Sequence, residues 1–181
     1  DDGAVPQSAE AHGKFGLPNV LLVGPPRGGV MGLLHQLVRP SSRVVAHSAN
    51  SVGAEALQMH DVNYFNLHWR SVSLEEFGKE FLWRGGSEGL VTRIDSTVTY
   101  TLCPEVPSRI RRAFRTGTVK IVLSIRNEID RAVGHYQECR ARGHSELGSF
   151  ASMVQRELSV IRRCDERFSH LTMRERWSQC Y

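Results

Sequence analysis

The chain has 181 residues, of which 40% are hydrophobic and 23% charged, and its formal net charge is +4. This composition excludes a fibrous or disordered chain, and the length suits one globular domain with its own core. The small positive excess favours a polyanionic partner but is low for a nucleic-acid-binding protein, so we expect no nucleic acid.

Targeting signals are absent from the sequence. No stretch approaches the roughly 18 consecutive apolar residues of a membrane span, and the N-terminus lacks the basic-then-apolar order of a signal peptide. The chain begins at Asp1 without a methionine, which suggests an excised lumenal domain. We therefore expect membrane attachment only through an anchor outside this sequence, and the oligomeric state is not constrained.

The four cysteines do not have the spacing of a zinc site, so we expect no metal. An even number permits two disulfides in three pairings, and free thiols in a reducing compartment are an equal alternative. The cysteines are Cys103, Cys139, Cys164 and Cys180.

In chain order, residues 1–16 are polar and aperiodic, which predicts a flexible lead-in before a folded domain at 17–181. The apolar run 19–24 predicts a strand buried on both faces. A Pro/Gly loop follows, and then residues 30–38 show a helical apolar face that Pro40 ends. The sequence therefore predicts a strand, a glycine-rich loop and a helix.

The rest of the chain continues to alternate between strands and helices. A capping box of Ser73 and Glu76 marks one helix start. The predicted strands are 43–47, 62–65, 90–95 and 119–125, the last as a second clearly buried strand, and the predicted helices are 74–83, 104–115, 127–142 and 147–168. This alternation predicts an α/β fold with a central parallel sheet flanked by helices.

The loop at 24–30 is typical of an anion site, because amides and the helix dipole converge where a strand meets a helix. Val30 and Met31 stand where a nucleotide triphosphatase has Lys and Ser or Thr, so the magnesium-binding hydroxyl is missing. A GxGxxG fingerprint is also missing. We expect a phosphate ester bound without metal, with Arg27 supplying charge; a tight connection without ligand is the alternative.

Two segments resemble a known family. Residues 17–34 read LPNVLLVGPPRGGVMGLL and are similar to the phosphosulfate loop of Golgi carbohydrate sulfotransferases, hhIGxxKGGTxxLxxxL. Residues 119–136 read VKIVLSIRNEIDRAVGHY and resemble that family's 3′-phosphate segment, KhhhhLRxPhxRAxSxY. The resemblance covers about residues 17–145. It implies a P-loop-like sulfotransferase fold, a Golgi or secretory location, 3′-phosphoadenosine-5′-phosphosulfate (PAPS) as cofactor, and a carbohydrate acceptor such as a glycosaminoglycan.

The resemblance also implies the residues around the nucleotide. Those expected at the 5′-phosphosulfate are Arg27, Gly28, Gly29, Val30 and Met31. Arg126 matches the arginine of the 3′-phosphate, and Gly134 takes the place of its serine partner. An ion pair at a helix start is the alternative for Arg126, although the helix dipole disfavours a cation there.

Two further segments resemble the acceptor side of the family. Residues 60–66, HDVNYFN, are similar to KExHFFD of heparan sulfate sulfotransferases, which implies Asp61 as general base, His60 as the competing base and Asn66 at the substrate. Residues 93–100, RIDSTVTY, resemble EKTPxYF, which implies Asp95 and Thr97 at the substrate. A turn carboxylate and a polar strand end are the respective alternatives.

Departures from the family pattern keep a second function open. Arg27 replaces lysine, Val30 replaces threonine and Ser96 replaces lysine. The predicted function is PAPS-dependent sulfonyl transfer; the alternative is a catalytically impaired nucleotide- or glycan-binding relative, and a phosphotransferase is disfavoured.

Because the family continues beyond a segment like 173–181, we also expect a C-terminal truncation. The arginines at 109–115 are expected on a solvated helix face, and contact with a polyanionic glycan acceptor is the alternative.

Overall fold

The computed structural model describes residues 16–38, 44–46, 62–81, 91–114, 118–144 and 148–168. The chain divides into two compact units, the first ending at Ile125 and the second beginning at Arg126. Each unit is considered by itself. The expected lead-in at 1–16 lies outside the described residues except for Gly16.

The first unit is built on a parallel sheet. Within the described residues its strands are β1 (Val20–Val23), β2 (Val44–Ala46), β3 (Thr92–Asp95) and β4 (Lys120–Leu123), in the order β2-β3-β1-β4. Leu21 of β1 lies opposite Asp95 on one side and Ile121 on the other. The predicted α/β class with a parallel sheet is confirmed, and β1 lies inside the sheet between β3 and β4.

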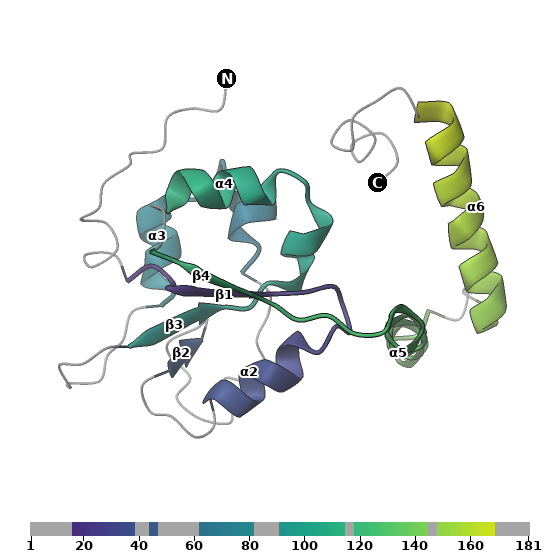
Figure 1. Cartoon of the computed structure of the whole chain (residues 1–181), viewed down its shortest axis with the longest axis horizontal. Helices are drawn as coiled ribbons and strands as arrows, with labels where there is room; N and C mark the ends of the chain where they lie inside the picture. Colours follow the sequence, from purple (N-terminus) through teal and green to yellow (C-terminus); the bar gives the residue numbers. More distant parts are fainter. Residues whose placement is uncertain are drawn as a thin grey trace. The chain divides into compact units, whose positions relative to one another are not determined.

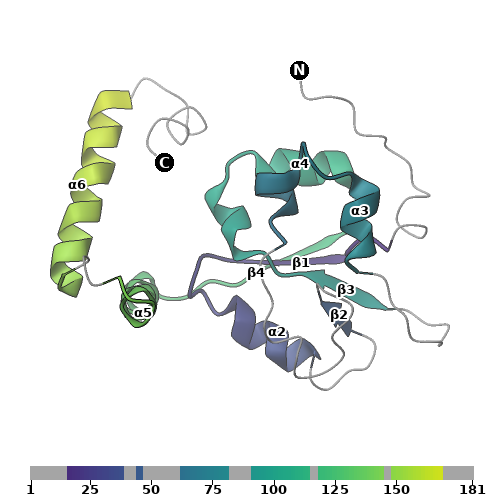
Figure 2. The same cartoon turned by 180° about the vertical axis from the view of Figure 1, so that it is seen from behind.

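Helices cover both faces of this sheet (Figure 1 and, from behind, Figure 2). Helix α2 (Val30–Val38) lies on one face, and α3 (Leu74–Lys79) and α4 (Val106–Ala113) lie on the other. Two short elements, the π-helix η2 (Tyr64–His68) and the 3₁₀ helix η3 (Val98–Leu102), complete the second layer. The glycine loop between β1 and α2 therefore leaves from the carboxyl edge of a central strand, where ligands bind in open α/β sheets.

The two faces have different cores. Under α2 the buried residues are aliphatic: Leu22, Val30, Leu34, Ala46 and Ile94. The opposite face buries a mainly aromatic cluster that includes Tyr64, Phe65, Trp69, Phe77, Phe81, Tyr100 and Phe114. Such aromatic rings bury large areas and dominate core energetics, so the layer holding η2, α3 and α4 has its own strong packing.

Helix α2 has the bounds that its apolar spacing predicts. Val30 and Leu34, four residues apart, are 2% and 1% exposed, whereas Leu37 is 40% exposed. The side chains that turn inward thus occupy one stripe of the helix, as an amphipathic helix requires. Helix α3 likewise begins at its predicted capping box, in which Ser73 and Glu76 bond reciprocally.

The predicted strand at 62–65 is wrong. Asn63 has φ 56, in the left-handed region, and η2 follows from Tyr64 to His68. Tyr64 and Phe65 are adjacent and both buried in the aromatic cluster. A strand would send neighbouring side chains to opposite faces, whereas a helical turn lets both reach the same core.

Strand β4 exists as predicted, but its predicted burial is wrong. It lies at the edge of the sheet, and all four of its residues are exposed. Ile121 and Leu123 are each 58% exposed and Val122 is 40% exposed. A continuous apolar run predicts a buried strand only where both faces are covered, and an edge position does not guarantee that.

The second unit contains α5 (Glu128–Ala141) and α6 (Phe150–Phe168). Asn127 caps α5 by accepting from the amides of Ile129 and Asp130, and Gly143, with φ 94, follows its end. Tyr136 joins the two helices, because its hydroxyl donates to the Gly148 carbonyl at 2.7 Å and its ring meets that of Phe150.

The apolar side chains of α6 differ in burial. Leu158 and Ile161 are 45% and 42% exposed, while Met153 is 3% exposed. Among the described helices, none is long and apolar enough to span a membrane.

Candidate functional site

The glycine loop is a tight turn held by its own backbone. The Gly28 amide donates to the Pro25 carbonyl at 2.8 Å, which closes a turn around Pro26 and Arg27. Arg27 has φ 63, a conformation that non-glycine residues rarely adopt, and Gly29 has φ 99. The loop is thus a defined turn, and it places the exposed residue Arg27 beside the start of α2.

The loop is fastened to the end of β4. The Ser124 hydroxyl donates to the Gly28 carbonyl at 2.8 Å, and the Ser124 amide donates to the Val23 carbonyl at 2.8 Å. A Cβ on Gly24 would lie 2.4 Å from the Ser124 carbonyl oxygen, and one on Gly28 would lie 2.7 Å from the Pro25 carbonyl oxygen. Both positions therefore require glycine because backbone approaches them closely.

The start of α2 has the electrostatics of an anion site. Its first turn carries no acidic residue, and the first amides of a helix lack partners within the helix. The Val30 side chain is 2% exposed and packs in the aliphatic core, and Met31 is half-buried. Val30 can therefore offer a ligand only its amide, and Arg27 supplies the nearby side-chain cation.

The predicted 3′-phosphate residues belong to the second unit. Arg126 is its first residue and precedes the cap Asn127, and Gly134 lies within α5. Arg126 is exposed. The structure thus places Arg126 at a helix start, as the sequence predicts, while its role in binding stays a prediction.

Asp95 and Thr97, predicted at the substrate, are both 0% exposed. The Asp95 Oδ1 atom accepts from the Thr97 amide at 3.1 Å and from its hydroxyl at 2.7 Å. Oδ2 accepts from the Tyr100 hydroxyl at 2.7 Å. Burial and the neighbouring Asp95 carboxylate raise the pKa of Tyr100 above its ordinary value, so the phenol remains a donor. Here Asp95 organises the end of β3.

This hydrogen-bonded group extends to η2. The Asn63 amide donates to Thr97 Oγ1 at 3.3 Å, and the Thr99 hydroxyl donates to Asn63 Oδ1 at 2.6 Å. The Asn66 side-chain amide donates to both Asn63 Oδ1 and Thr99 Oγ1. Asn66, predicted at the substrate, thus contacts η3 in this structure, and these bonds hold the left-handed turn at Asn63.

Arg109 of α4 forms hydrogen bonds with the backbone of η2. Its Nη1 donates to the carbonyl oxygens of Phe65 and Asn66 at 2.7 and 3.1 Å. The prediction of a purely solvated arginine face on α4 is therefore wrong for Arg109. Its guanidinium satisfies carbonyl groups of the π-helix that would otherwise need water.

The predicted base Asp61 and its competitor His60 lie outside the described residues. The described chain resumes directly after them, at Val62. The roles of Asp61 and His60 stay predictions.

No group of three or more potential metal-ligating side chains occurs in the part of the chain that the structure describes. Cys103 and Cys139 are free thiols. The predicted alternative of two disulfides is thus not formed, and Cys180 lies outside the described residues.

Sequence reasoning missed three residues that organise this region. Ser124 lies within the second family-like segment, and only its position at a strand end could have indicated contact with the loop. Asn63 carried a turn signal, since asparagine tolerates the left-handed region. Arg109 gave no signal of its own, because its partners are backbone carbonyls 43 and 44 positions away.

The fold and site define an α/β protein with a glycine-rich strand–loop–helix at the carboxyl edge of a parallel sheet. No protein-family model, curated protein or solved structure was found to match the chain.

Proposed function

We propose that the chain is a PAPS-dependent sulfotransferase of the carbohydrate type, with a P-loop-like fold. The acceptor is a hydroxyl or amine of a carbohydrate, and the location is the Golgi lumen. The proposal rests on the resemblance of residues 17–34 and 119–136 to the two nucleotide segments of that family, and on the way these segments meet.

The observation that carries the proposal is the contact between the two segments. β1 and β4 are parallel neighbours, with Val23 opposite Leu123, and Ser124 donates to Gly28. The glycine loop and the beginning of the second segment thus lie at one edge of the sheet. A nucleotide carrying phosphates at both its 5′ and 3′ positions needs two anion-binding segments, and the second family-like segment begins beside the glycine loop.

The loop fits an anion that is held without metal. The amides at the start of α2 and the Arg27 guanidinium are donors, and the first turn has no carboxylate to repel a sulfate or phosphate. Sulfonyl transfer develops charge on the departing bridging oxygen, so donors aimed there stabilise the transition state. In this proposal Arg27 does so, Arg126 binds the 3′-phosphate and Asp61 takes the acceptor proton.

The test is transfer of radiolabelled sulfonate from PAPS to a panel of glycosaminoglycans and smaller glycans. We expect Asp61→Asn to lower kcat by roughly 100-fold or more, because it removes a general base. Glu157→Gln, a change at an exposed position of α6, is the matched control and should retain wild-type kcat. If Asp61→Asn is as active as wild type, Asp61 is not the base.

A second candidate function is supported by Val30. Its side chain packs in the aliphatic core. Valine therefore lacks the hydroxyl that the threonine of the family has at this position. A catalytically impaired relative would bind the nucleotide yet transfer nothing to any glycan. ATP hydrolysis with magnesium would contradict both candidates and favour a phosphotransferase.

A further inference from the structure

Strand β4 is an open edge of the sheet in the first unit. Within the described residues its only neighbouring strand is β1. The hydrogen bonds to β1 show which backbone groups face the open side. The Ser124 amide donates to the Val23 carbonyl of β1, and successive residues of a strand direct their N–H and C=O groups to opposite sides. The amide and carbonyl groups of Leu123 and, two residues earlier, of Ile121 therefore face outward.

The side chains of β4 are apolar on both faces of the sheet. Ile121 and Leu123, each 58% exposed, lie on one face, and Val122, 40% exposed, lies on the other. Lys120, at the start, is the one charged residue of the strand. Exposed edges are normally protected by charged side chains, proline or a bulge, so the last three residues of β4 form a template for another strand.

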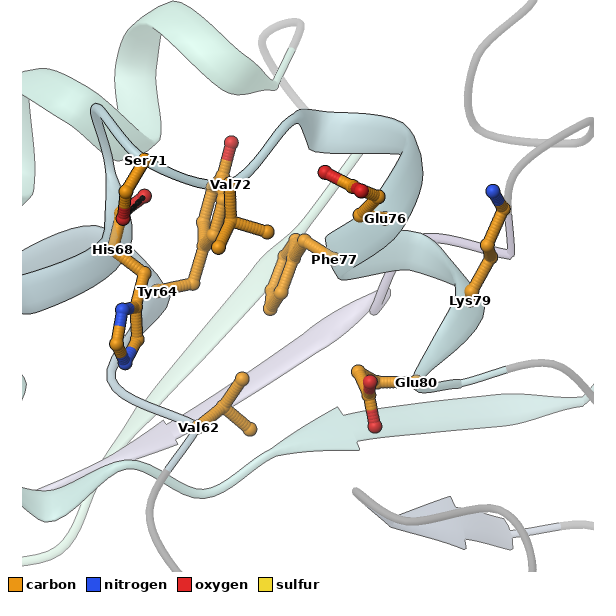
Figure 3. Close-up of a pocket in the computed structure, with 9 residues that line it drawn as sticks. All are labelled: Val62, Tyr64, His68, Ser71, Val72, Glu76, Phe77, Lys79 and Glu80. Carbon is orange, nitrogen blue, oxygen red and sulfur yellow. Dashed lines mark hydrogen bonds between the residues drawn. The ribbon is translucent and has the colours of Figure 1, made fainter.

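The neighbouring strand shows how such side chains are covered elsewhere in the sheet. Leu21 of β1, opposite Ile121 in the register, is 0% exposed and belongs to the aromatic cluster. In that cluster the rings of Tyr64 and Phe77 stack with their centroids 4.2 Å apart, and Figure 3 shows them side by side between η2 and α3. Ile121 lies on the same face of the sheet but remains 58% exposed, so the aromatic cluster does not cover it.

The outward backbone groups of β4 are self-complementary. Ile121 and Leu123 lie symmetrically about Val122, so a second β4 that runs antiparallel places its Leu123 opposite Ile121 and its Ile121 opposite Leu123. Each of these opposite pairs exchanges two N–H···O bonds, and the two Val122 residues meet at the two-fold axis as a pair without hydrogen bonds. One symmetry axis thus satisfies every outward group of Ile121 and Leu123 in both copies.

The side chains and the charges suit the same pairing. Ile121 and Leu123 of both copies form one apolar group on the face that carries α3, and the two Val122 side chains meet on the face that carries α2. Lys120 lies opposite Ser124 of the second copy, so the paired strands bring no like charges opposite each other. The strip is small beside the about 800 Å² per partner that stable complexes bury, so the association is weak.

We propose that β4 pairs with β4 of a second copy of this chain, antiparallel and centred on Val122, so that the two sheets join into one. The surface is an isologous interface, in which the same residues serve both copies. It uses none of the residues assigned to the nucleotide or the acceptor and does not depend on the proposed sulfotransferase function.

Sedimentation of the full chain over a range of concentrations tests for the dimer. We expect a reversible monomer–dimer equilibrium with a dissociation constant on the order of 100 μM. Leu123→Pro should weaken it about tenfold or more, because it removes two of the four bonds. Its missing N–H faces the open side, so the bonds to β1 are retained. Ile129→Ser, at a 65% exposed position of α5, is the control and should dimerise as wild type.

Two outcomes of the sedimentation experiment overturn the proposal. One is a wild-type chain that stays monomeric up to millimolar concentration. The other is a Leu123→Pro variant that dimerises as wild type while its thermal unfolding is unchanged.

Cysteine crosslinking tests the register, and it does not depend on how well the proline variant folds. Across the two-fold axis the Cα atoms of Val122 lie about 4.5 Å apart, which a disulfide can span. The Lys120 residues lie on the same face but about 13 Å apart along the strands, beyond that reach. With oxidised glutathione, Val122→Cys should therefore give at least about tenfold more disulfide-linked dimer than Lys120→Cys or the wild-type chain. Equal yields from the two variants would refute the pairing centred on Val122.

Discussion

At the scale of single residues, the glycine loop depends on two positions that only glycine can occupy. Gly24 faces the Ser124 carbonyl and Gly28 faces the Pro25 carbonyl, at distances that leave no room for a Cβ. Gly32, in α2, is different: a Cβ there meets no heavy atom within 4 Å in the described structure. Its glycine is thus not required by packing.

The first prediction contrasts these glycines. Gly24→Ala should lower the free energy of unfolding by about 1–3 kcal/mol, because the loop and Ser124 must move apart. Gly32→Ala should raise it by about 0.5–1 kcal/mol, because alanine is the better helix former. Urea denaturation followed by circular dichroism measures both. Equal effects of the two substitutions would show that Gly24 does not approach the end of β4.

At the scale of elements, the buried Asp95 ties η3 to the end of β3 and, through Tyr100, to η2. The Tyr100 hydroxyl donates to Asp95 and accepts from the Phe65 amide at 3.4 Å. Tyr136, in the second unit, also donates a hydroxyl, to the Gly148 carbonyl, but that bond is exposed.

The second prediction compares these two tyrosines. Tyr100→Phe removes one hydrogen-bond donor from the buried Asp95 carboxylate and should cost about 1–3 kcal/mol of stability. Tyr136→Phe removes an exposed bond whose groups water can satisfy, so it should cost less than about 1 kcal/mol. Thermal unfolding of both variants measures the difference. A Tyr100→Phe variant as stable as wild type would mean that Asp95 does not depend on this donor.

Elements with strong local signals could be predicted from the sequence. The apolar stripe and the following Pro40 predict α2. The spacing of Ser73 and Glu76 predicts the start of α3, where the structure shows both capping-box bonds. The π-helix could not be predicted, because Tyr64 and Phe65 have high strand propensity and only the aromatic core places both on one side.

Burial was harder to predict than the elements themselves. The run at 119–125 predicts strand β4 correctly, but its hydrophobicity gives no information about what covers it, and β4 is an exposed edge. For the candidate site, the loop and its strand neighbour could be predicted from the two segments. The Ser124–Gly28 bond and the Arg109 contacts arise from residues far apart in the sequence, and no local pattern contains them.

At the scale of the whole molecule, the central claim is that the chain binds a nucleotide carrying 5′ and 3′ phosphates. One proposed contact, Arg27, lies in the first unit and the other, Arg126, begins the second. Because both arginines are proposed contacts of this nucleotide, removal of either should weaken nucleotide binding. An arginine on α6 that has no assigned role provides a control.

Calorimetric titration of the full chain with 3′-phosphoadenosine-5′-phosphate tests this claim most directly. We predict saturable binding at one site, weakened roughly tenfold or more by Arg27→Ala and by Arg126→Ala, since bonds to charged groups contribute about 1.5–3 kcal/mol each. The exposed control variant Arg156→Ala should bind as wild type. No saturable binding by the folded wild-type chain, or equal affinity in all three variants, would contradict the nucleotide site.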